Sequence, residues 1–214
     1  MLLHGQKWVL DARPDNWAEH FNAIMSIAGI TGIGALSLGL NQSRAARRHQ
    51  QEARTDSLTG LLNRRALFDS LSNGQLHESD AVIAFDLDRF KAINDRHGHC
   101  GGYLVLRCFA EVLRLHARQG DLAARTSGEE FILVMRDTSL ALAIDTAERI
   151  RASFAASDVK AARGEIKATA SAGVALPQSV DESFEDVLKR ADAALYKAKD
   201  TGRNRDSSQF QVAA

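Results

Sequence analysis

Hydrophobic and polar positions in this chain follow two repeat patterns after residue 80, one typical of strands and the other of helices. Short apolar runs bounded by turn residues predict strands, and apolar residues three or four positions apart predict helices. The predicted strands cover 81–87, 122–126, 131–135 and 166–176, and the predicted helices cover 89–96, 103–118, 140–154 and 184–198. Because strands alternate with helices and two strands are joined as a hairpin, we expect an α/β (α+β) fold with a mixed sheet.

Residues that start or stop helices lie where these patterns break. Ser183 precedes the last predicted helix and can accept a hydrogen bond from its first turn, and Gly202 follows that helix. Gly98 closes the short helix that begins at Arg89. Residues 127–130, Ser-Gly-Glu-Glu, separate two strands and predict a hairpin turn. These residues mark where the predicted helices and strands begin and end.

Acidic residues occur at the predicted strand ends. Asp86 closes an apolar strand, and Glu129 lies in the hairpin turn. Neighbouring strands can bring both carboxylates to one sheet edge, where they would suit Mg²⁺, which prefers one or two carboxylates together with substrate phosphates. Lys91, Lys199 and Arg203 could bind a triphosphate. On residue types alone, solvated turn carboxylates are the simpler interpretation.

Several other charged residues have a structural interpretation. Asp88 and Asp95 can cap the short helix at 89–96. Arg64 and Arg65 are expected at surface or hinge contacts, and Lys197 on the solvated face of the last helix.

An uncharged stretch near the N-terminus predicts a membrane segment. Residues 21–40, at about 1.5 Å per residue in a helix, are long enough to cross a bilayer core. Arg44, Arg47 and Arg48 follow, which places the C-terminal side in the cytoplasm. We therefore expect a short extracytoplasmic segment at 1–20, a transmembrane helix at 21–40 and a connecting helix at 41–55. A buried soluble helix is the alternative, although the four glycines of this stretch would weaken it.

Composition limits the class of protein. The chain has 214 residues, of which 45% are hydrophobic and 25% charged, as in folded globular proteins. Lys+Arg and Asp+Glu both total 27, so a chain-wide attraction to nucleic acid is not indicated. Cys100 and Cys108 lie about two turns apart on a predicted helix, too far for a disulfide, which fits reduced thiols in the cytoplasm.

Five ordered motifs carry a family resemblance. They are DSLTGLLNRR (56–65), FDLDRFKAINDRHGH (85–99), RTSGEEF (125–131), SAGVAL (171–176) and ADAALYKAKDTGRNR (191–205). In order and spacing they resemble the GGDEF family of diguanylate cyclases. The resemblance implies a catalytic domain at 56–210 with a five-stranded mixed sheet wrapped by helices, related to the palm of polymerases and of class III nucleotide cyclases.

The resemblance also implies roles for individual residues. Asp86 and Glu129 would supply side-chain ligands, and Leu87 a carbonyl ligand, to two Mg²⁺ ions per active site, which Mn²⁺ could replace. Glu129 is also the candidate base for the ribose 3′-hydroxyl, and Glu130 would support the metal or its water. The implied substrate-binding residues are Phe90, Lys91, Asn94, His99, Tyr103, Lys199 and Arg203.

The implied activity is the condensation of two GTP molecules to cyclic di-GMP and two pyrophosphates by two-metal phosphoryl transfer. Each domain would bind one GTP, so ring closure needs a symmetric homodimer. Arg118 and Asp121 match an inhibitory product site for cyclic di-GMP. With the predicted span at 21–40, the implied location is the bacterial inner (cytoplasmic) membrane with the catalytic domain in the cytoplasm.

Two positions depart from the family pattern. Ser127 stands where the family usually has glycine, which a small residue can replace unless the backbone needs a positive φ. Tyr103 stands where the family usually has an aspartate that binds the guanine edge, and a phenol offers fewer acceptors. Two alternatives therefore stay open: an impaired domain that binds cyclic di-GMP or GTP as a regulatory receptor, or a cyclase with altered base preference.

Overall fold

The computed structural model describes residue 25 and residues 54–72, 76–162, 164–179 and 181–208. From residue 54 on, its helices are α2 (Arg64–Ser72), α3 (Phe90–His116), α4 (Leu140–Ala156) and α5 (Phe184–Asp200). Its strands are β1 (Leu62–Asn63), β2 (Ala81–Leu87), β3 (Leu122–Ser127), β4 (Glu130–Met135), β5 (Val159–Ala161), β6 (Gly164–Ile166), β7 (Ala170–Ala175) and β8 (Asp206–Ser208). One mixed sheet has the strand order β1-β3-β4-β2-β7-β8, and β5 pairs with β6 in a separate hairpin.

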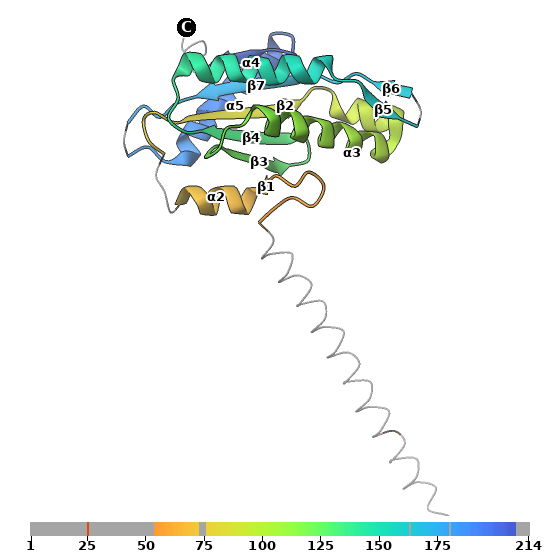
Figure 1. Ribbon diagram of the computed structural model, residues 1–214, viewed down its shortest axis with the longest axis horizontal. Coiled ribbons are helices and arrows are strands. Elements are labelled where there is room, and N and C mark those ends of the chain that lie inside the picture. Colours follow the sequence, from red (N-terminus) through yellow and green to blue (C-terminus); the bar gives the residue numbers. More distant parts are fainter. Residues whose placement is uncertain (1–24, 26–53, 73–75, 163, 180, 209–214) are drawn as a thin grey trace, which may run out of the picture. The chain divides into compact units, whose positions relative to one another are not determined.

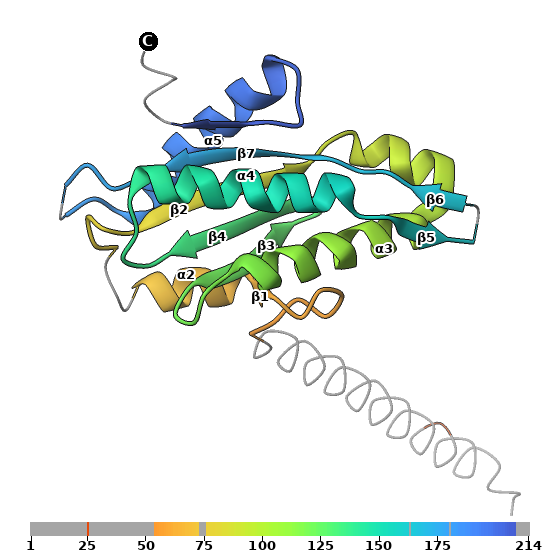
Figure 2. The same ribbon diagram turned by 45° about the horizontal axis from the view of Figure 1, so that its top comes forward.

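Helices cover both faces of the six-stranded sheet (Figure 1, Figure 2). Along β2, Ile83 and Phe85 belong to the core beneath α3 and α4, whereas Val82 and Ala84 belong to the core beneath α2 and α5. Strand side chains alternate between faces in this way, and covering both faces makes the strand apolar throughout. The strand predicted at 81–87 is confirmed with these bounds.

Helix α5 packs directly on β7 at Gly173. A Cβ atom at Gly173 would lie 2.1 Å from the carbonyl oxygen of Ala191 and 2.3 Å from the nitrogen of Leu195, so only glycine permits this approach. Ser183 caps α5 as predicted, because its side chain accepts a hydrogen bond from the first turn at 3.2 Å. The helix is thus fixed both at its start and along the sheet.

The sheet has six strands where five were expected. β1 and β8, at its two edges, contain two and three residues, which is too short for an apolar repeat to be visible. The strand predicted at 166–176 is also divided, since β6 ends at Ile166 and β7 begins at Ala170. The division occurs where Thr169 directs its carbonyl and hydroxyl groups to Asp88. The sequence pattern also does not predict α2.

Gly98 divides α3 into two segments. Its backbone has φ 74° and ψ 170°, outside the helical region and in a range that favours glycine. The predicted end of the first helix at Gly98 is confirmed as a break in helical geometry, but the two helices predicted at 89–96 and 103–118 are continuous through it as α3.

Among the described residues, no helix combines the length and the apolar character that spanning a bilayer requires. The segments predicted at 1–20 and 21–40, and all but the last two residues of that at 41–55, lie outside the described residues apart from residue 25. Thr55 forms a bridge with Leu62 and so is not part of a connecting helix.

Candidate active site

Asp86 and Glu129 lie at the same edge of the sheet. Asp86 lies near the end of β2, where it pairs with Glu130 of β4 on one side and with Ser171 of β7 on the other. Glu129 is in the turn between β3 and β4, and its carbonyl oxygen accepts a hydrogen bond from the Leu87 N–H at 3.3 Å. The hairpin therefore brings Glu129 beside the end of β2.

A lysine from α5 neutralises the first of these carboxylates. Lys199 Nζ lies 2.7 Å from Asp86 Oδ2. Asp86 is only 8% exposed, and burial raises the pKa of its carboxyl, while the hydrogen bond and positive charge of Lys199 oppose that shift. The sequence prediction placed Lys199 on a phosphate, whereas here its ammonium is paired with the candidate metal ligand.

The two turn glutamates have different environments. Burial, followed by the negative charge of Asp86, raises the pKa of Glu129. Glu130 is exposed and accepts a hydrogen bond from the Ser127 hydroxyl at 2.7 Å. Ser127 does not have a positive φ, so the turn tolerates serine at this position. A raised pKa suits Glu129 to a role as proton acceptor.

The donor set suits a hard divalent cation. Within the described residues, no group of three or more His, Cys, Asp or Glu side chains could hold a metal ion. Asp86 and Glu129 supply two carboxylates, which matches Mg²⁺, since that ion takes one or two protein carboxylates and completes its shell with substrate phosphates and water.

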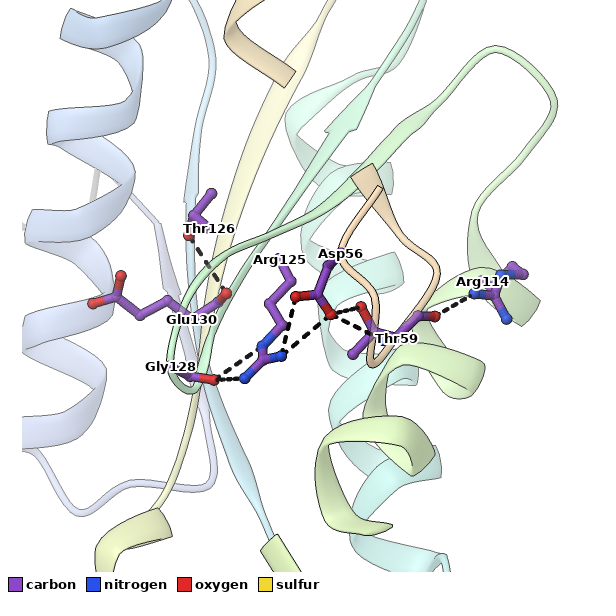
Figure 3. A network of polar contacts seen from close by, with 7 residues as sticks. All are labelled: Asp56, Thr59, Arg114, Arg125, Thr126, Gly128 and Glu130. Carbon is purple, nitrogen blue, oxygen red and sulfur yellow. Dashed lines mark hydrogen bonds and ion pairs between the residues drawn. The ribbon is translucent and has the colours of Figure 1, made fainter. Parts of the chain in front are cut away.

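Arg125 anchors the turn that carries Glu129 (Figure 3). Its Nε and Nη2 atoms donate to the carbonyl oxygen of Gly128 at 3.0 and 2.7 Å. Its Nη1 atom donates to both carboxylate oxygens of Asp56 at 3.2 Å. One guanidinium therefore ties the turn to the segment that begins the described part of the domain.

Asp56 is itself held by hydrogen bonds within the segment that follows it. Burial favours its neutral form, but hydrogen bonds from Thr59 and the charge of Arg125 hold the pKa of Asp56 below its usual value. The Thr59 N–H and hydroxyl donate to Asp56 at 2.9 and 2.7 Å, and Arg114 of α3 donates to the Thr59 carbonyl at 2.8 Å (Figure 3). Sequence analysis assigned no role to Asp56 or Arg125.

Asp88 is not a helix cap as predicted. It is 6% exposed, and its carboxylate accepts hydrogen bonds from the Thr169 hydroxyl at 2.7 Å, the Ser171 hydroxyl at 2.7 Å and the Asn204 N–H at 3.0 Å. The N-cap position of α3 is instead Arg89, which makes no side-chain cap. Asp88 thus joins the end of β2 to the segment that follows α5.

The segment held by Asp88 contains a predicted phosphate ligand. Arg203 and Asn204 both have left-handed backbone conformations, with φ 62° and 48°, which are costly for residues other than glycine. The hydrogen bond from Asn204 to Asp88 offsets that cost. Asp88 is therefore a positioning residue for Arg203.

The start of α3 leaves backbone donors available for an anion. Arg89 has φ 55° and no side chain caps the helix, so the first N–H groups have no side-chain acceptor. Phe90 is buried beneath this turn, and Lys91 is exposed. The arrangement fits the predicted phosphate-binding loop.

The predicted base-binding residues lie across the kink of α3. A Cβ atom at Gly102 would lie 2.0 Å from Asn94 Oδ1, so the Asn94 amide rests against the second segment of the helix. Tyr103, the next residue, is 51% exposed, and His99 is also exposed. The structure thus places Asn94 next to the position of Tyr103.

The predicted product site is at the other end of β3. The Asp121 carboxylate accepts hydrogen bonds from the N–H groups of Arg118 at 2.8 Å and Arg136 at 3.1 Å. The Arg118 side chain is exposed. Six residues of β3 separate Asp121 from the catalytic turn, a span of about 20 Å.

A cavity of about 240 Å³ lies on the α5 side of Asp86. Its lining includes three polar residues that sequence analysis did not place in the site: Arg64, Asp192 and Tyr196. Burial, and then the charge of Glu130, raises the pKa of Asp192. The sequence gives no signal that Arg64 of α2 and Asp192 and Tyr196 of α5 share a cavity, because these helices come together only when the sheet forms.

Comparisons with known proteins agree on one family. The family model described as "Diguanylate cyclase, GGDEF domain" matches residues 53–205. Diguanylate cyclase DgcM of Escherichia coli is 40% identical over 169 residues, which are 77% of this chain and 40% of that protein. Response regulator PleD of Caulobacter vibrioides is 44% identical over 157 residues, 70% of this chain and 35% of that protein. The chain therefore spans less than half the length of these relatives.

Solved structures show the same fold. The GGDEF domain of DgcB from Caulobacter crescentus, in complex with c-di-GMP, has a TM-score of 0.69 at 34% identity and covers 74% of this chain and 97% of that one. The active GGEEF domain of a diguanylate cyclase from Vibrio cholerae has a TM-score of 0.60 at 33% identity and covers 70% and 97%. That GGEEF domain has glutamate at the third signature position, as Glu129 is here.

The first prediction concerns Asp88. Replacing it with alanine leaves one buried donor, the Ser171 hydroxyl, and two partly buried donors without their acceptor, so Asp88→Ala should lower the free energy of unfolding by about 3 kcal/mol. Asp88→Asn keeps one acceptor oxygen and should lower the free energy of unfolding by clearly less than Asp88→Ala does. Urea unfolding measures both values, and Asp95→Ala, at an exposed position of α3, is the control. Equal stability of Asp88→Ala and Asp95→Ala would contradict the assigned role.

Proposed function

The chain belongs to the GGDEF family of diguanylate cyclase domains, and from this premise we propose that it condenses two GTP molecules to cyclic di-GMP. The observation that carries the proposal is the pair of carboxylates, Asp86 and Glu129, at one sheet edge with Lys199 beside them. Groups that could bind phosphate are near in the chain, since the uncapped start of α3 follows Asp86 and Arg203 follows Lys199.

In the proposed reaction, each ribose 3′-oxygen attacks the α-phosphorus of the other GTP, and each GTP loses pyrophosphate. Glu129, whose pKa is raised, accepts the 3′-hydroxyl proton. The start of α3, Lys91 and Arg203 bind the triphosphate and hold it in line with the attacking oxygen. Bound Mg²⁺ or Mn²⁺, held by Asp86, Glu129 and the Leu87 carbonyl, would supply the positive charge that stabilises the developing phosphate charge.

Lys199 connects cation binding to phosphate binding. Its ammonium compensates the buried charge of Asp86 in the metal-free protein. A dication held by Asp86 would supply the positive charge that Lys199 supplies here, and the ammonium would then be available to the terminal phosphates of GTP.

Other parts of the proposal extend beyond one domain. Ring closure requires two domains facing each other, which we propose to be two copies of this chain. Arg118 and Asp121 are proposed to bind cyclic di-GMP as an inhibitor, since they present an exposed guanidinium beside a fixed carboxylate. Attachment to a membrane through residues 21–40 remains a prediction.

Tyr103 favours a second candidate function. Its side chain is exposed, and it follows Gly102, against which the Asn94 amide rests, at the position where the family usually has a carboxylate. If this replacement prevents productive GTP binding, the domain is a receptor for cyclic di-GMP or GTP. Incubation with Mg²⁺ and GTP, ATP or both, followed by mass spectrometry of the products, separates a cyclase from a receptor and from a cyclase of altered base preference.

Glu129→Gln should abolish formation of cyclic di-GMP without destabilising the domain. Because the pKa of Glu129 is raised, the folded state binds a proton more readily than the unfolded state, and ionisation costs stability as pH rises above the ordinary value of 4.5. The neutral amide removes that cost, so the unfolding temperature at neutral pH should be equal to or above that of the wild type. Glu185→Gln, at an exposed position of α5, is the control. Residual turnover in Glu129→Gln would exclude Glu129 as the base.

Arg118→Ala should weaken product inhibition. The arginine offers a charge-assisted, two-pronged contact to phosphate, so its loss should raise the inhibitory concentration of cyclic di-GMP by about 10-fold or more. Initial rates at increasing cyclic di-GMP measure the change, and Gln119→Ala is the neighbouring exposed control. An unchanged inhibition curve would refute the site.

Tyr103→Asp should lower the KM for GTP. The carboxylate restores acceptors for the guanine edge, and one charge-assisted hydrogen bond corresponds to about 10- to 150-fold in binding. The preference for GTP over ATP should also sharpen. Leu104→Asp adds the same charge at the next exposed position and should have neither effect. A higher KM in Tyr103→Asp would show that the tyrosine itself binds substrate.

A further inference from the structure

A second, larger cavity lies on the other side of the start of α3. Its volume is about 670 Å³, within the range of small-molecule sites. The first segment of α3, residues 165–169 and residues 202–204 form its walls, and β5 and β6 lie beside α3 in both views (Figure 1, Figure 2). Asp86, Glu129, Asn94 and Tyr103 do not line it.

Basic side chains dominate the lining of this cavity. Arg89, Arg96 and Arg203 contribute guanidinium groups that have no ion pair or hydrogen-bond acceptor within the described part of the chain. Lys167 is different, because it is already paired with Glu165 at 3.1 Å and with Asp158. We call the surface formed by Arg89, Arg96 and Arg203 the arginine groove.

The groove carries a net positive charge. Besides Glu165, which Lys167 neutralises, its acidic lining residue is Asp88. The Asp88 carboxylate is occupied by two hydroxyl groups and a backbone N–H. Three guanidinium groups therefore face a common space without an acid free to pair with them, which favours a ligand with several negative charges.

The groove is built on fixed backbone. Arg89 and Arg203 both have left-handed conformations, with φ 55° and 62°. The segments that carry them are joined through Asp88, which precedes Arg89 in the chain and accepts from the Asn204 N–H at 3.0 Å. The backbone of two of the three arginines is thus held beside one buried carboxylate.

The ligand chemistry follows from the lining. Phe, Tyr and Trp are absent from the lining residues in the described part of the chain, and His97 contributes the one aromatic ring, so charged groups dominate the groove. Guanidinium groups bind phosphate oxygens in pairs, and three of them suit an anion with more than one phosphate. The groove begins at Arg203, the residue proposed to hold the terminal phosphates of GTP.

We propose that the arginine groove binds inorganic pyrophosphate, the leaving group of the cyclase reaction, and is its route out of the active site. The identity of this anion rests on the proposed function. Breaking the bond between the α-phosphorus and its bridging oxygen releases pyrophosphate next to Arg203, and Arg89 and Arg96 extend the positive surface away from Asp86 and Glu129.

Calorimetric titration of the full chain with inorganic pyrophosphate, in the presence of a chelator, tests this proposal. Removing divalent cations suppresses metal-dependent binding at Asp86 and Glu129. Arg96→Gln should weaken binding by about 10-fold, as expected for the loss of one charge-assisted contact to phosphate. Arg107→Gln removes an exposed arginine from the second segment of the same helix, outside the groove, and should change binding by less than about twofold.

Two results would overturn the inference. One is equal binding by wild type and Arg96→Gln, and the other is equal weakening in Arg96→Gln and Arg107→Gln, which would indicate general electrostatic attraction. Adding Lys199→Gln to both chains tests independence from the triphosphate site: the effect of Arg96→Gln should persist there. Cyclic di-GMP formation is measured separately, so that loss of the cyclase proposal with intact pyrophosphate binding, or the reverse, identifies which of the two has failed.

Discussion

Two buried carboxylates lie at the end of strand β2. Asp86 is in the strand, and Asp88 follows its last residue, Leu87. A buried carboxylate needs partners to remain charged, and each of these two has one partner at the C-terminal end of α5 or in the residues after it. Lys199 pairs with Asp86, and the Asn204 N–H bonds to Asp88, which also accepts from the Thr169 and Ser171 hydroxyl groups. A cation bound at Asp86 would replace the contact with Lys199, whereas the contact with Asn204 holds the segment that carries Arg203 in place.

The turn that carries Glu129 depends on a second arrangement of the same kind. The Arg125 guanidinium donates to the Gly128 carbonyl from one side and to the Asp56 carboxylate from the other (Figure 3). An exposed hairpin turn would otherwise have few contacts to fix its backbone. Thr59 donates to Asp56, and Arg114 of α3 donates to the Thr59 carbonyl. The turn of the candidate base, Glu129, is therefore connected to the helix whose start is the predicted phosphate-binding loop.

Sequence patterns predicted the parts of this structure that depend on neighbours in the chain. The apolar run of β2, the hairpin around Glu129 and the cap at Ser183 are local signals, and the structure confirms each of them. The contacts that connect elements were not predictable in the same way. Asp88 has the sequence context of a helix cap, but its acceptors are used by residues 81 to 116 positions away. Edge strands β1 and β8 were missed because they are too short to show a pattern.

The distribution of charge around the start of α3 gives the proposed substrate a direction. Asp86, Glu129 and Glu130 lie on one side of the β2–α3 junction, with Lys199 among them. Arg89, Arg96 and Arg203 line the other side, without acids free to pair with them in the described part of the chain. The acidic side would favour a bound cation, and the basic side would favour the terminal oxygens of a triphosphate. Under the proposed function, the α-phosphorus would then face Glu129 and the pyrophosphate end would face the arginine groove. The reverse orientation would place negative phosphate against buried carboxylates, which is the costlier arrangement, so this distribution of charge would favour one orientation without any contact to the base.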